Sequence, residues 1–202
     1  MTTGPVGPTT PRLVIRLAVP EDGSELARIY RPAVEEHPTS FELSAPDGAE
    51  MGRRVAALLP RFPWLVGVEG EALIGYAYAS AHRERAAYGW SVEVSAYVDA
   101  RADRRGVARA LYKSLLAVLG LQGFQNAYAG IALPNPASTG FHEAMGFRAV
   151  GTYHRVGFKH GQWRDVRWYE RSLGKHPASP APPRPLATVL TEPAFQAALA
   201  SG

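Results

Sequence analysis

A basic loop near the middle of the chain has the residue types that bind an anionic group. It lies between a strand-like segment, residues 90–98, and a helical pattern that starts at Val107, and its arginines are Arg101, Arg104, Arg105 and Arg109. Backbone N–H groups at the start of a helix have no partner within that helix, and a glycine such as Gly106 lets an anion approach them closely. The loop therefore predicts a pyrophosphate site, although glycine and arginine turns also occur as ordinary solvated loops.

Two further residues have side chains suited to proton transfer. Glu93 lies in the middle of segment 90–98, on the polar face that it shares with Ser95 and Tyr97. This alternation alone is also typical of a glutamate that faces solvent. His142 lies in a short helical pattern, where a lone histidine often has only a structural role. For Glu93 and for His142, the pattern alone does not decide between a catalytic and a structural role.

The order of apolar patterns along the chain predicts a mixed α/β fold. Expected strands cover residues 13–18, 64–68, 72–78, 90–98, 128–133, 148–158 and 163–173, and expected helices start at Asp22 or cover residues 51–59, 107–119 and 137–145. Asp22 and Glu25 have the spacing of a capping box, and Pro32 is expected to kink or split the helix after them. Gly120 is expected to end the helix that starts at Val107.

Proline placement predicts where the folded domain begins and ends. More than half of the 17 prolines lie before Arg12 or after Gly174. We therefore expect a flexible N-terminal tail over residues 1–11, one domain over residues 12–173, and a Pro/Ala-rich C-terminal tail over residues 174–202. The C-terminal tail contains one candidate short helix with Phe195 and Leu199. Its deletion is expected to leave the thermal midpoint and the turnover nearly unchanged.

The composition excludes several classes of protein. The chain has 202 residues, of which 46% are hydrophobic and 20% are charged, as in ordinary globular domains. The absence of cysteine excludes disulfides, thiolate nucleophiles and cysteine metal sites. No stretch approaches the roughly 18 apolar residues of a membrane span, and we expect a soluble cytoplasmic protein. The net charge of +4, with a single arginine cluster, does not provide the wide basic face of a nucleic-acid-binding protein.

The chain resembles the GNAT superfamily of N-acetyltransferases, and within it the phosphinothricin acetyltransferase branch. The motifs that carry the resemblance follow one another in the family's order, and they are Ala87–Glu93, Arg104–Ala108, Leu133–Ser138, His142–Phe147 and Lys159–Val166. The resemblance covers nearly all of residues 12–173. It implies a V-shaped mixed sheet flanked by helices, acetyl-CoA bound where two strands diverge, no metal, and a homodimer.

The same resemblance assigns residues to acetyl-CoA and to catalysis. It implies that the pyrophosphate is held by the loop Arg104, Arg105, Gly106, Val107, Ala108 and Arg109, that the pantetheine arm pairs with Ala96, Tyr97 and Val98, and that Asn135 makes a further contact. Glu93 is implied as the general base for an ammonium group, and His142 as a donor to the departing thiolate. Asp103 departs from the family, which usually has Gln or Arg there, and an acidic side chain beside a pyrophosphate is expected to weaken binding.

The resemblance also implies a pocket for a small amino acid. Arg85 suits a carboxylate or phosphinate, while Tyr88, Tyr112 and Phe41 match pocket positions. Each of these residues has an ordinary alternative as a surface or packing residue. Gly130 stands where relatives carry a branched apolar side chain, which predicts a larger or shifted pocket.

These observations lead to one main hypothesis and several alternatives. The main hypothesis is direct acetyl transfer from acetyl-CoA to an amino acid such as phosphinothricin, methionine sulfoximine or methionine sulfone. The same fold could instead acetylate a polyamine, an antibiotic or a protein terminus. A non-catalytic acyl-CoA-binding module would need the loop but not Glu93 or His142. No nucleic-acid or membrane partner is expected.

Overall fold

The structure is a computed structural model that describes residues 12–202, so the expected N-terminal tail, residues 1–11, lies outside the described residues. One seven-stranded mixed sheet has the order β1-β2-β3-β4-β5-β7-β6. Its strands are β1 (Leu13–Leu17), β2 (Trp64–Glu69), β3 (Ala72–Ala81), β4 (Ser91–Val98), β5 (Asn126–Ala132), β6 (Arg148–Lys159) and β7 (Gln162–Ser172). The expected α/β class and each expected strand are therefore confirmed.

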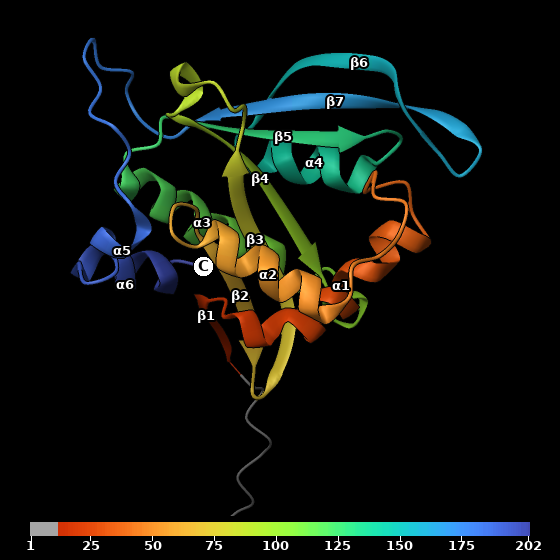
Figure 1. The fold of residues 1–202 in the computed structure, drawn as a ribbon, viewed down its shortest axis with the longest axis horizontal. Coiled ribbons are helices and arrows are strands. Elements are labelled where there is room, and N and C mark those ends of the chain that lie inside the picture. The colour runs from red at the N-terminus through yellow and green to blue at the C-terminus, as the bar shows by residue number, and fades with distance from the viewer. Residues whose placement is uncertain (1–11) are drawn as a thin grey trace, which may run out of the picture.

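The sheet divides between β4 and β5. These two strands run parallel, but they pair only from Ser91 with Asn126 to Glu93 with Tyr128. Beyond that point β5 turns away across the molecule while β4 continues beside β3 (Figure 1). The result is the expected V shape, in which the second half of β4 has a strand partner on one side only.

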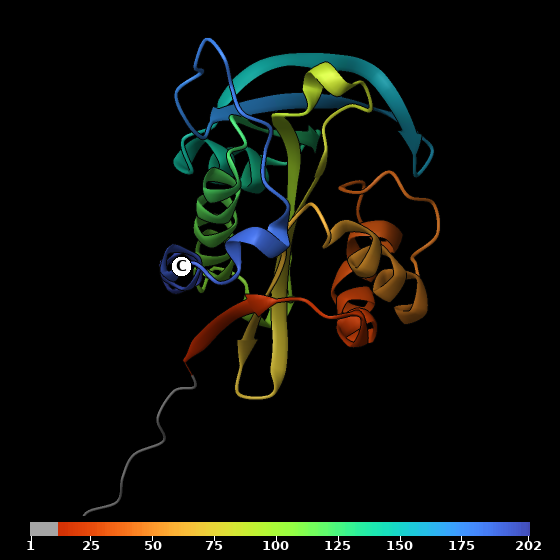
Figure 2. The ribbon, with the colours of Figure 1, turned by 60° about the vertical axis from the view of Figure 1, so that its left-hand side comes forward.

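Helices cover both faces of the sheet (Figure 2). They are α1 (Gly23–Glu35), α2 (Gly48–Leu58), α3 (Val107–Gln122) and α4 (Pro136–Ala144), followed by α5 (Leu186–Val189) and α6 (Pro193–Ala200). Short 3-10 turns cover Pro20–Asp22, Ala86–Tyr88 and Ala100–Ala102. Figure 2 places α1 and α2 on one side of β2, β3 and β4, with α3 on the other.

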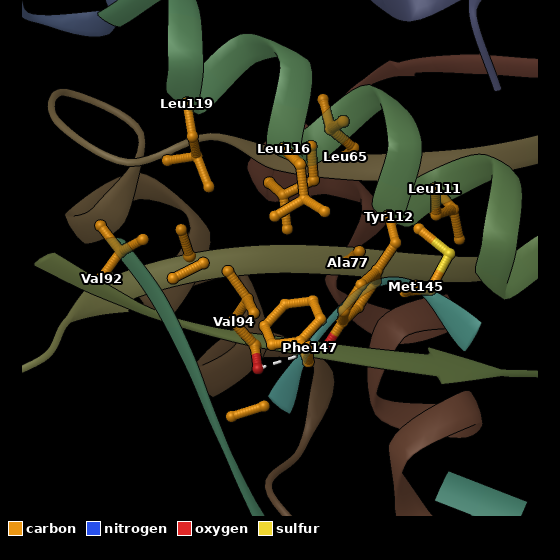
Figure 3. Packing of buried hydrophobic residues seen from close by; sticks show 14 of the residues in the cluster. Leu65, Ala77, Val92, Val94, Leu111, Tyr112, Leu116, Leu119, Met145 and Phe147 are labelled. Carbon is orange, nitrogen blue, oxygen red and sulfur yellow. Dashed lines mark hydrogen bonds between the residues drawn. The ribbon is translucent and has the colours of Figure 1, made fainter. Parts of the chain in front are cut away.

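The main core lies between α3 and the sheet. Leu111, Leu115 and Leu119 follow one another on α3 at helical spacing and belong to one buried cluster with Val92 and Val94 of β4. Figure 3 shows Leu111 and Leu119 in this cluster. These side chains are almost fully buried, and each such burial contributes about 1.5–3 kcal/mol. The packing fixes the position of α3, and with it the loop that precedes the helix.

Three local expectations differ from the structure. Asp22 does not cap α1 with its side chain, because its carboxylate accepts hydrogen bonds from Arg16 at 2.7 and 2.8 Å and from the Val19 N–H at 2.9 Å. Pro32 does not split α1, which continues from Gly23 to Glu35, so of the two expected effects the split is wrong and the kink stays a prediction. Gly120 does not end α3, which continues to Gln122 and is capped by Gly123 at a φ of 94°. Tertiary packing outweighs the local signal in the last two cases.

The C-terminal segment packs against the domain instead of remaining a free tail. Leu186, Val189, Phe195 and Ala198 form a buried cluster with Val118 on the outer side of α3. The proline-rich segment before α5 is held by Trp90, whose indole N–H donates to Ala181 O at 2.8 Å, and by the Arg184 N–H, which donates to Gln122 O at 2.7 Å. The expectation that removal of residues 174–202 has little effect on stability is therefore revised.

Candidate active site

A cavity of about 610 Å³ opens where β4 and β5 diverge. Its walls come from the second half of β4, the start of α3, the end of β5 and α4. The lining includes most of the residues expected for acetyl-CoA, namely Ala96, Tyr97, Val98, Arg104, Gly106, Val107, Ala108, Arg109 and Asn135. Residues far apart in the sequence thus meet in one cavity, whose lining includes the N-terminus of α3.

The loop before α3 presents backbone donors to this cavity. Gly106 is the N-cap of α3 at a φ of 82°, and no side chain caps the helix. A Cβ at Gly106 would have no atom within 4 Å, so the approach to the N–H groups of the first turn is open. Unpaired N–H groups and the positive helix end favour a negatively charged group.

The arginines and Asp103 of this loop differ in what they offer. Arg104 is exposed, while the Arg105 guanidinium pairs with Glu69 at 2.7 Å and does not line the cavity. The Asp103 carboxylate accepts a hydrogen bond from the Arg104 N–H at 2.9 Å. Asp103 therefore occupies one of the backbone donors of the loop, in addition to bringing a negative charge near it.

Asp99 fixes the loop at its other end. Its buried carboxylate accepts hydrogen bonds from Arg28 of α1 at 2.5 Å and from the Arg101 side chain at 2.6 and 3.0 Å. The Arg101 side chain, with further bonds from the Arg101 N–H and Arg28, holds the pKa of this carboxyl well below its usual range. Asp99 is a site feature that the sequence pattern alone did not reveal.

Tyr112 and His142 meet inside the cavity. The Tyr112 hydroxyl lies 3.1 Å from His142 Nε2 and 3.3 Å from Val94 O, and Figure 3 shows the second contact. His142 Nδ1 lies 2.8 Å from Ser138 O, which assigns the ring proton to Nδ1. Burial lowers the pKa of His142, so the imidazole is neutral at neutral pH and its Nε2 accepts from Tyr112.

Glu93 lies at the point where β4 and β5 separate, outside the lining of this cavity. One of its carboxylate oxygens, Oε1, is 3.1 Å from His82 Nδ1 and 3.1 Å from Arg83 Nη1. The sequence analysis did not identify His82. The pairing of Ser80 with Glu93 would have indicated it, because the residue two beyond Ser80 projects on the same side of β3.

The expected substrate residues do not all meet in one cavity. Tyr112 and Gly130 line the cavity between β4 and β5, whereas Arg85 and Tyr88 line a separate cavity of about 700 Å³. Phe41 lies on the loop between α1 and α2 and packs on Gly157 of β6, where a Cβ would overlap its ring. Thr39 of the same loop lines the first cavity.

Gly130 does not leave an empty space in the wall. A Cβ at this position would lie 3.3–3.4 Å from the Trp168 ring and Val166, so the tryptophan takes up the room that a branched side chain would use. The sequence predicted a larger or shifted pocket from the small residue alone. The partner strand β7 supplies the missing volume, because Gly130 pairs with Trp168.

Comparison with known proteins adds three findings. A family model described as an acetyltransferase (GNAT) domain matches residues 15–168. A phosphinothricin N-acetyltransferase of Streptomyces viridochromogenes is 37% identical over 175 residues, which cover 87% of this chain and 93% of the relative. An L-methionine sulfoximine/L-methionine sulfone acetyltransferase of Salmonella typhimurium is 28% identical, covering 84% of this chain and 99% of the relative.

A solved structure resembles the present one closely. It is a phosphinothricin acetyltransferase from Sinorhizobium meliloti in complex with acetyl-CoA, with a TM-score of 0.79 and 35% identity, and the match covers 84% of this chain and 93% of that chain. Within residues 12–202, no group of histidine, aspartate and glutamate side chains could hold a metal ion, and no helix has the length and apolarity to cross a bilayer.

Proposed function

The chain belongs to the GNAT family of acetyltransferases, and we propose that it transfers an acetyl group from acetyl-CoA to the amino group of a small amino acid. The substrate class we favour is phosphinothricin, methionine sulfoximine and methionine sulfone, on which the relatives act by name. The observation that carries the proposal is the separation of β4 from β5 directly after Glu93. Beyond Glu93, the edge of β4 that faces β5 is free, and it connects the carboxylate with the open N-terminus of α3.

The residues present suit acetyl-CoA. The uncapped first turn of α3 suits the pyrophosphate, and the free side of β4 from Val94 to Val98 offers backbone groups to the pantetheine arm. Asn135 is occupied at the N-cap of α4, where its side chain accepts from the Ser138 N–H at 3.0 Å, which leaves its amide N–H₂ for the ligand. Acetyl-CoA supplies an activated acetyl thioester to an amine.

We assign the first proton transfer to Glu93. An amino acid binds as its ammonium form, and the nitrogen can attack only after it loses a proton. The Glu93 carboxylate lies at the apex of the divergence, with Oε2 free of any hydrogen bond to the described residues. The absence of cysteine from the chain agrees with direct attack by the amine.

Tyr112 is assigned the hydrogen bond to the departing thiolate. His142 is neutral at neutral pH and has no proton on Nε2, so it does not provide the proton that the sequence analysis assigned to it. Burial also raises the pKa of Tyr112 far above its usual value, which favours donation of a hydrogen bond over loss of the proton. Because this hydroxyl has a single proton, its O–H turns from His142 Nε2 to the thiolate when the thiolate forms.

Release of free thiol from acetyl-CoA tests the proposed reaction. We expect turnover with phosphinothricin and the methionine analogues, and little with spermidine, an aminoglycoside or a peptide with a free amino terminus. Thiol release with one of the latter group alone would favour the alternative amine substrates. Acetyl-CoA binding without any thiol release would favour the non-catalytic module.

The variant Glu93→Gln tests the role of the carboxylate. Turnover near pH 7 is expected to fall by about 10²–10⁴-fold, the usual contribution of a general base, while acetyl-CoA binding persists. The deficit is expected to shrink as the pH approaches the pKa of the substrate amine, because free amine then forms without help. A loss that is independent of pH and accompanied by instability would indicate a structural role.

We also propose that two copies associate through the hairpin of β6 and β7. Most of β6 is exposed, and the exposed large apolar residues of this hairpin are Val150, Tyr153, Val156, Phe158 and Trp163. A concentration of exposed apolar side chains on an edge strand is typical of an interaction surface. We further propose that the enzyme works in the cytoplasm, where the acetyl-CoA pool is available.

A further inference from the structure

His82 occupies an enclosed position beside Glu93. It follows the end of β3, and its side chain is only 13% exposed. The imidazole stacks on the Tyr128 ring of β5 at 4.3 Å, with an interplanar angle of 17°. Tyr88 and Trp168 contact it edge-on, each at 5.9 Å between ring centroids. Four segments of the chain therefore hold this ring in one orientation.

The hydrogen bond of His82 is directed at the carboxylate that the proposed reaction uses. Nδ1 lies 3.1 Å from Glu93 Oε1, and a neutral imidazole can meet an ionised carboxylate there only as an N–H donor. The proton is therefore on Nδ1, and Nε2 carries a free lone pair. No hydrogen bond from the described residues reaches Nε2.

One oxygen of the Glu93 carboxylate already accepts two hydrogen bonds, from His82 and from Arg83. Arg83 donates to the same oxygen at 3.1 Å, and its guanidinium also lies over the Trp168 ring at 5.6 Å. The two donors fix the position of this oxygen beside the imidazole. An imidazole has an intrinsic pKa about two units higher than a glutamate and is the stronger base of the two.

The charges around His82 keep it ready to accept a proton. Burial lowers the pKa of His82, and the Arg83 charge acts in the same direction, while Glu93 raises it. The titratable and charged groups that face the ring are Glu93 from β4, Arg83 from its own segment, Tyr88 from the short helix Ala86–Tyr88, and Tyr128 from β5. At neutral pH the imidazole is unprotonated, and the carboxylate is placed to stabilise the imidazolium once it forms.

We propose that His82 is the proton acceptor of the reaction and that Glu93 orients it and stabilises its charged form. This inference rests on the proposed function, and within it the role of proton acceptor passes from Glu93 to His82. One N–H bond of the substrate ammonium breaks and its electron pair stays on nitrogen. The proton moves to His82 Nε2, directly or through one water, while Nδ1–H remains bonded to Glu93 Oε1. The imidazolium afterwards releases the proton to solvent.

Two substitutions distinguish proton transfer by His82 from its hydrogen bond and its ring packing. His82→Asn keeps an N–H donor near the position of Nδ1 but has no titrating group, and His82→Phe keeps an aromatic ring against Tyr128 without the hydrogen bond. We expect both to lower kcat at pH 7 by about 10²–10⁴-fold while the KM for acetyl-CoA changes little. His176→Gln, which alters an exposed histidine bonded to Asn126, is the matched control and is expected to keep full activity.

The pH profile and a double variant distinguish catalysis from packing. In the unaltered enzyme, kcat/KM for the amino acid is expected to rise with pH through the pKa of His82, and this limb is expected to disappear in both variants. Because the two residues act as one unit, His82→Phe combined with Glu93→Gln is expected to be no slower than the slower single variant. Full activity in His82→Asn, or losses that multiply in the double variant, would overturn the proposal.

A titration of the histidine side chains by NMR tests the pair without any turnover. The His82 resonance, assigned by its loss in His82→Phe, is expected to titrate to a lower pKa in Glu93→Gln, because the carboxylate no longer stabilises the imidazolium. An unchanged pKa would overturn the proposal even if the enzyme is active. Absence of thiol release together with the expected pKa change would instead contradict the proposed function alone.

Discussion

Individual charged residues fix the positions of the segments that surround the site. Asp99 ties α1 to the loop before α3 through Arg28 and Arg101, and its carboxyl pKa is lowered in the folded state. A lowered pKa means that the stabilisation is present above the unfolded pKa of about 3.9 and is lost as the pH falls through the folded pKa. The contribution of Asp99 is therefore expected to be full at neutral pH and small in strong acid.

The variant Asp99→Asn makes this expectation measurable. We expect the free energy of unfolding at pH 7 to fall by about 1.5–3 kcal/mol, the usual value for a hydrogen bond to a charged group. Urea denaturation at pH 7 and below pH 3 measures the difference from the unaltered protein, which is expected to shrink at the lower pH. The exposed Asp103→Asn serves as the control. A difference that stays constant with pH would contradict the role of the charge.

Arg85 supplies a second test at the scale of a residue. If it holds the anionic group of the amino acid, Arg85→Ala is expected to raise the KM for that substrate by about tenfold to a hundredfold, with little effect on the KM for acetyl-CoA. The structure places Arg85 in a different cavity from Tyr112, so the substrate would have to extend between the two. Equal changes in both KM values, or no change in either, would reject the assignment.

Residue types and spacing predicted some parts of the site better than others. Gly106 was predicted from the local pattern and Asn135 from the family resemblance, and both line the cavity. His82 was missed because its contact with Glu93 depends on the register of β3 against β4, which the sequence does not state. The bond from the Arg104 N–H to Asp103 depends on loop geometry and was missed for the same kind of reason.

At the scale of elements, the loop between α1 and α2 is attached to the far edge of the sheet. Lys159 at the end of β6 is 4% exposed, and its ammonium donates to Ser40 O at 2.6 Å and to Glu42 O at 2.9 Å. The Glu42 carboxylate in turn accepts from Arg54 of α2 at 2.7 and 3.0 Å. The loop that carries Thr39 and Phe41 is thus fixed from two sides.

Lys159→Met tests whether this attachment positions the substrate pocket. The loss of two charged hydrogen bonds is expected to loosen residues 36–47 and to raise the KM for the amino acid by about tenfold or more, leaving the KM for acetyl-CoA nearly unchanged. Hydrogen exchange over residues 36–47 and the two KM values are the measurements. Lys113→Met, on the exposed side of α3, is the control. Unaltered exchange in the loop would show that Lys159 does not hold it.

Elements with strong periodicity were predicted correctly, and their ends were predicted less well. The alternation in β4 and the hairpin of β2 and β3 both appear in the structure. The extension of α3 beyond Gly120 was not predictable locally, because Gln122 is buried and donates from its side chain to Arg61 O and Arg184 O. These partners lie about 60 residues away in each direction along the chain.

At the scale of the whole molecule, the C-terminal helices extend the core of the domain. Phe195 is 3% exposed and packs in the cluster that contains Val118, while Gln196 beside it is exposed. We expect Phe195→Ala to lower the free energy of unfolding by about 3 kcal/mol and removal of residues 186–202 to lower it at least as much. Gln196→Ala is the matched control. Thermal midpoints that match those of the unaltered protein would restore the original interpretation of a dispensable tail.

Association of two molecules through the hairpin of β6 and β7 is the remaining prediction. Phe158 and Trp163 contact each other at 5.4 Å between ring centroids and are both more than half exposed, which leaves a large apolar surface uncovered in a single chain. Light scattering is expected to give the mass of a dimer for the unaltered protein and of a monomer for Phe158→Asp combined with Trp163→Asp. Buried carboxylates without partners would oppose the contact.

Val14→Asp is the control for this experiment, because Val14 is an apolar residue that is 55% exposed and lies on β1, at the opposite edge of the sheet. A dimer that persists in Phe158→Asp combined with Trp163→Asp would place the interface elsewhere, and a monomeric unaltered protein would exclude it. The same hairpin carries Lys159, which is bonded to the loop between α1 and α2. If the dimer forms as proposed, the paired variant is therefore expected to raise the KM for the amino acid while binding acetyl-CoA normally, since the cofactor cavity lies between β4 and β5.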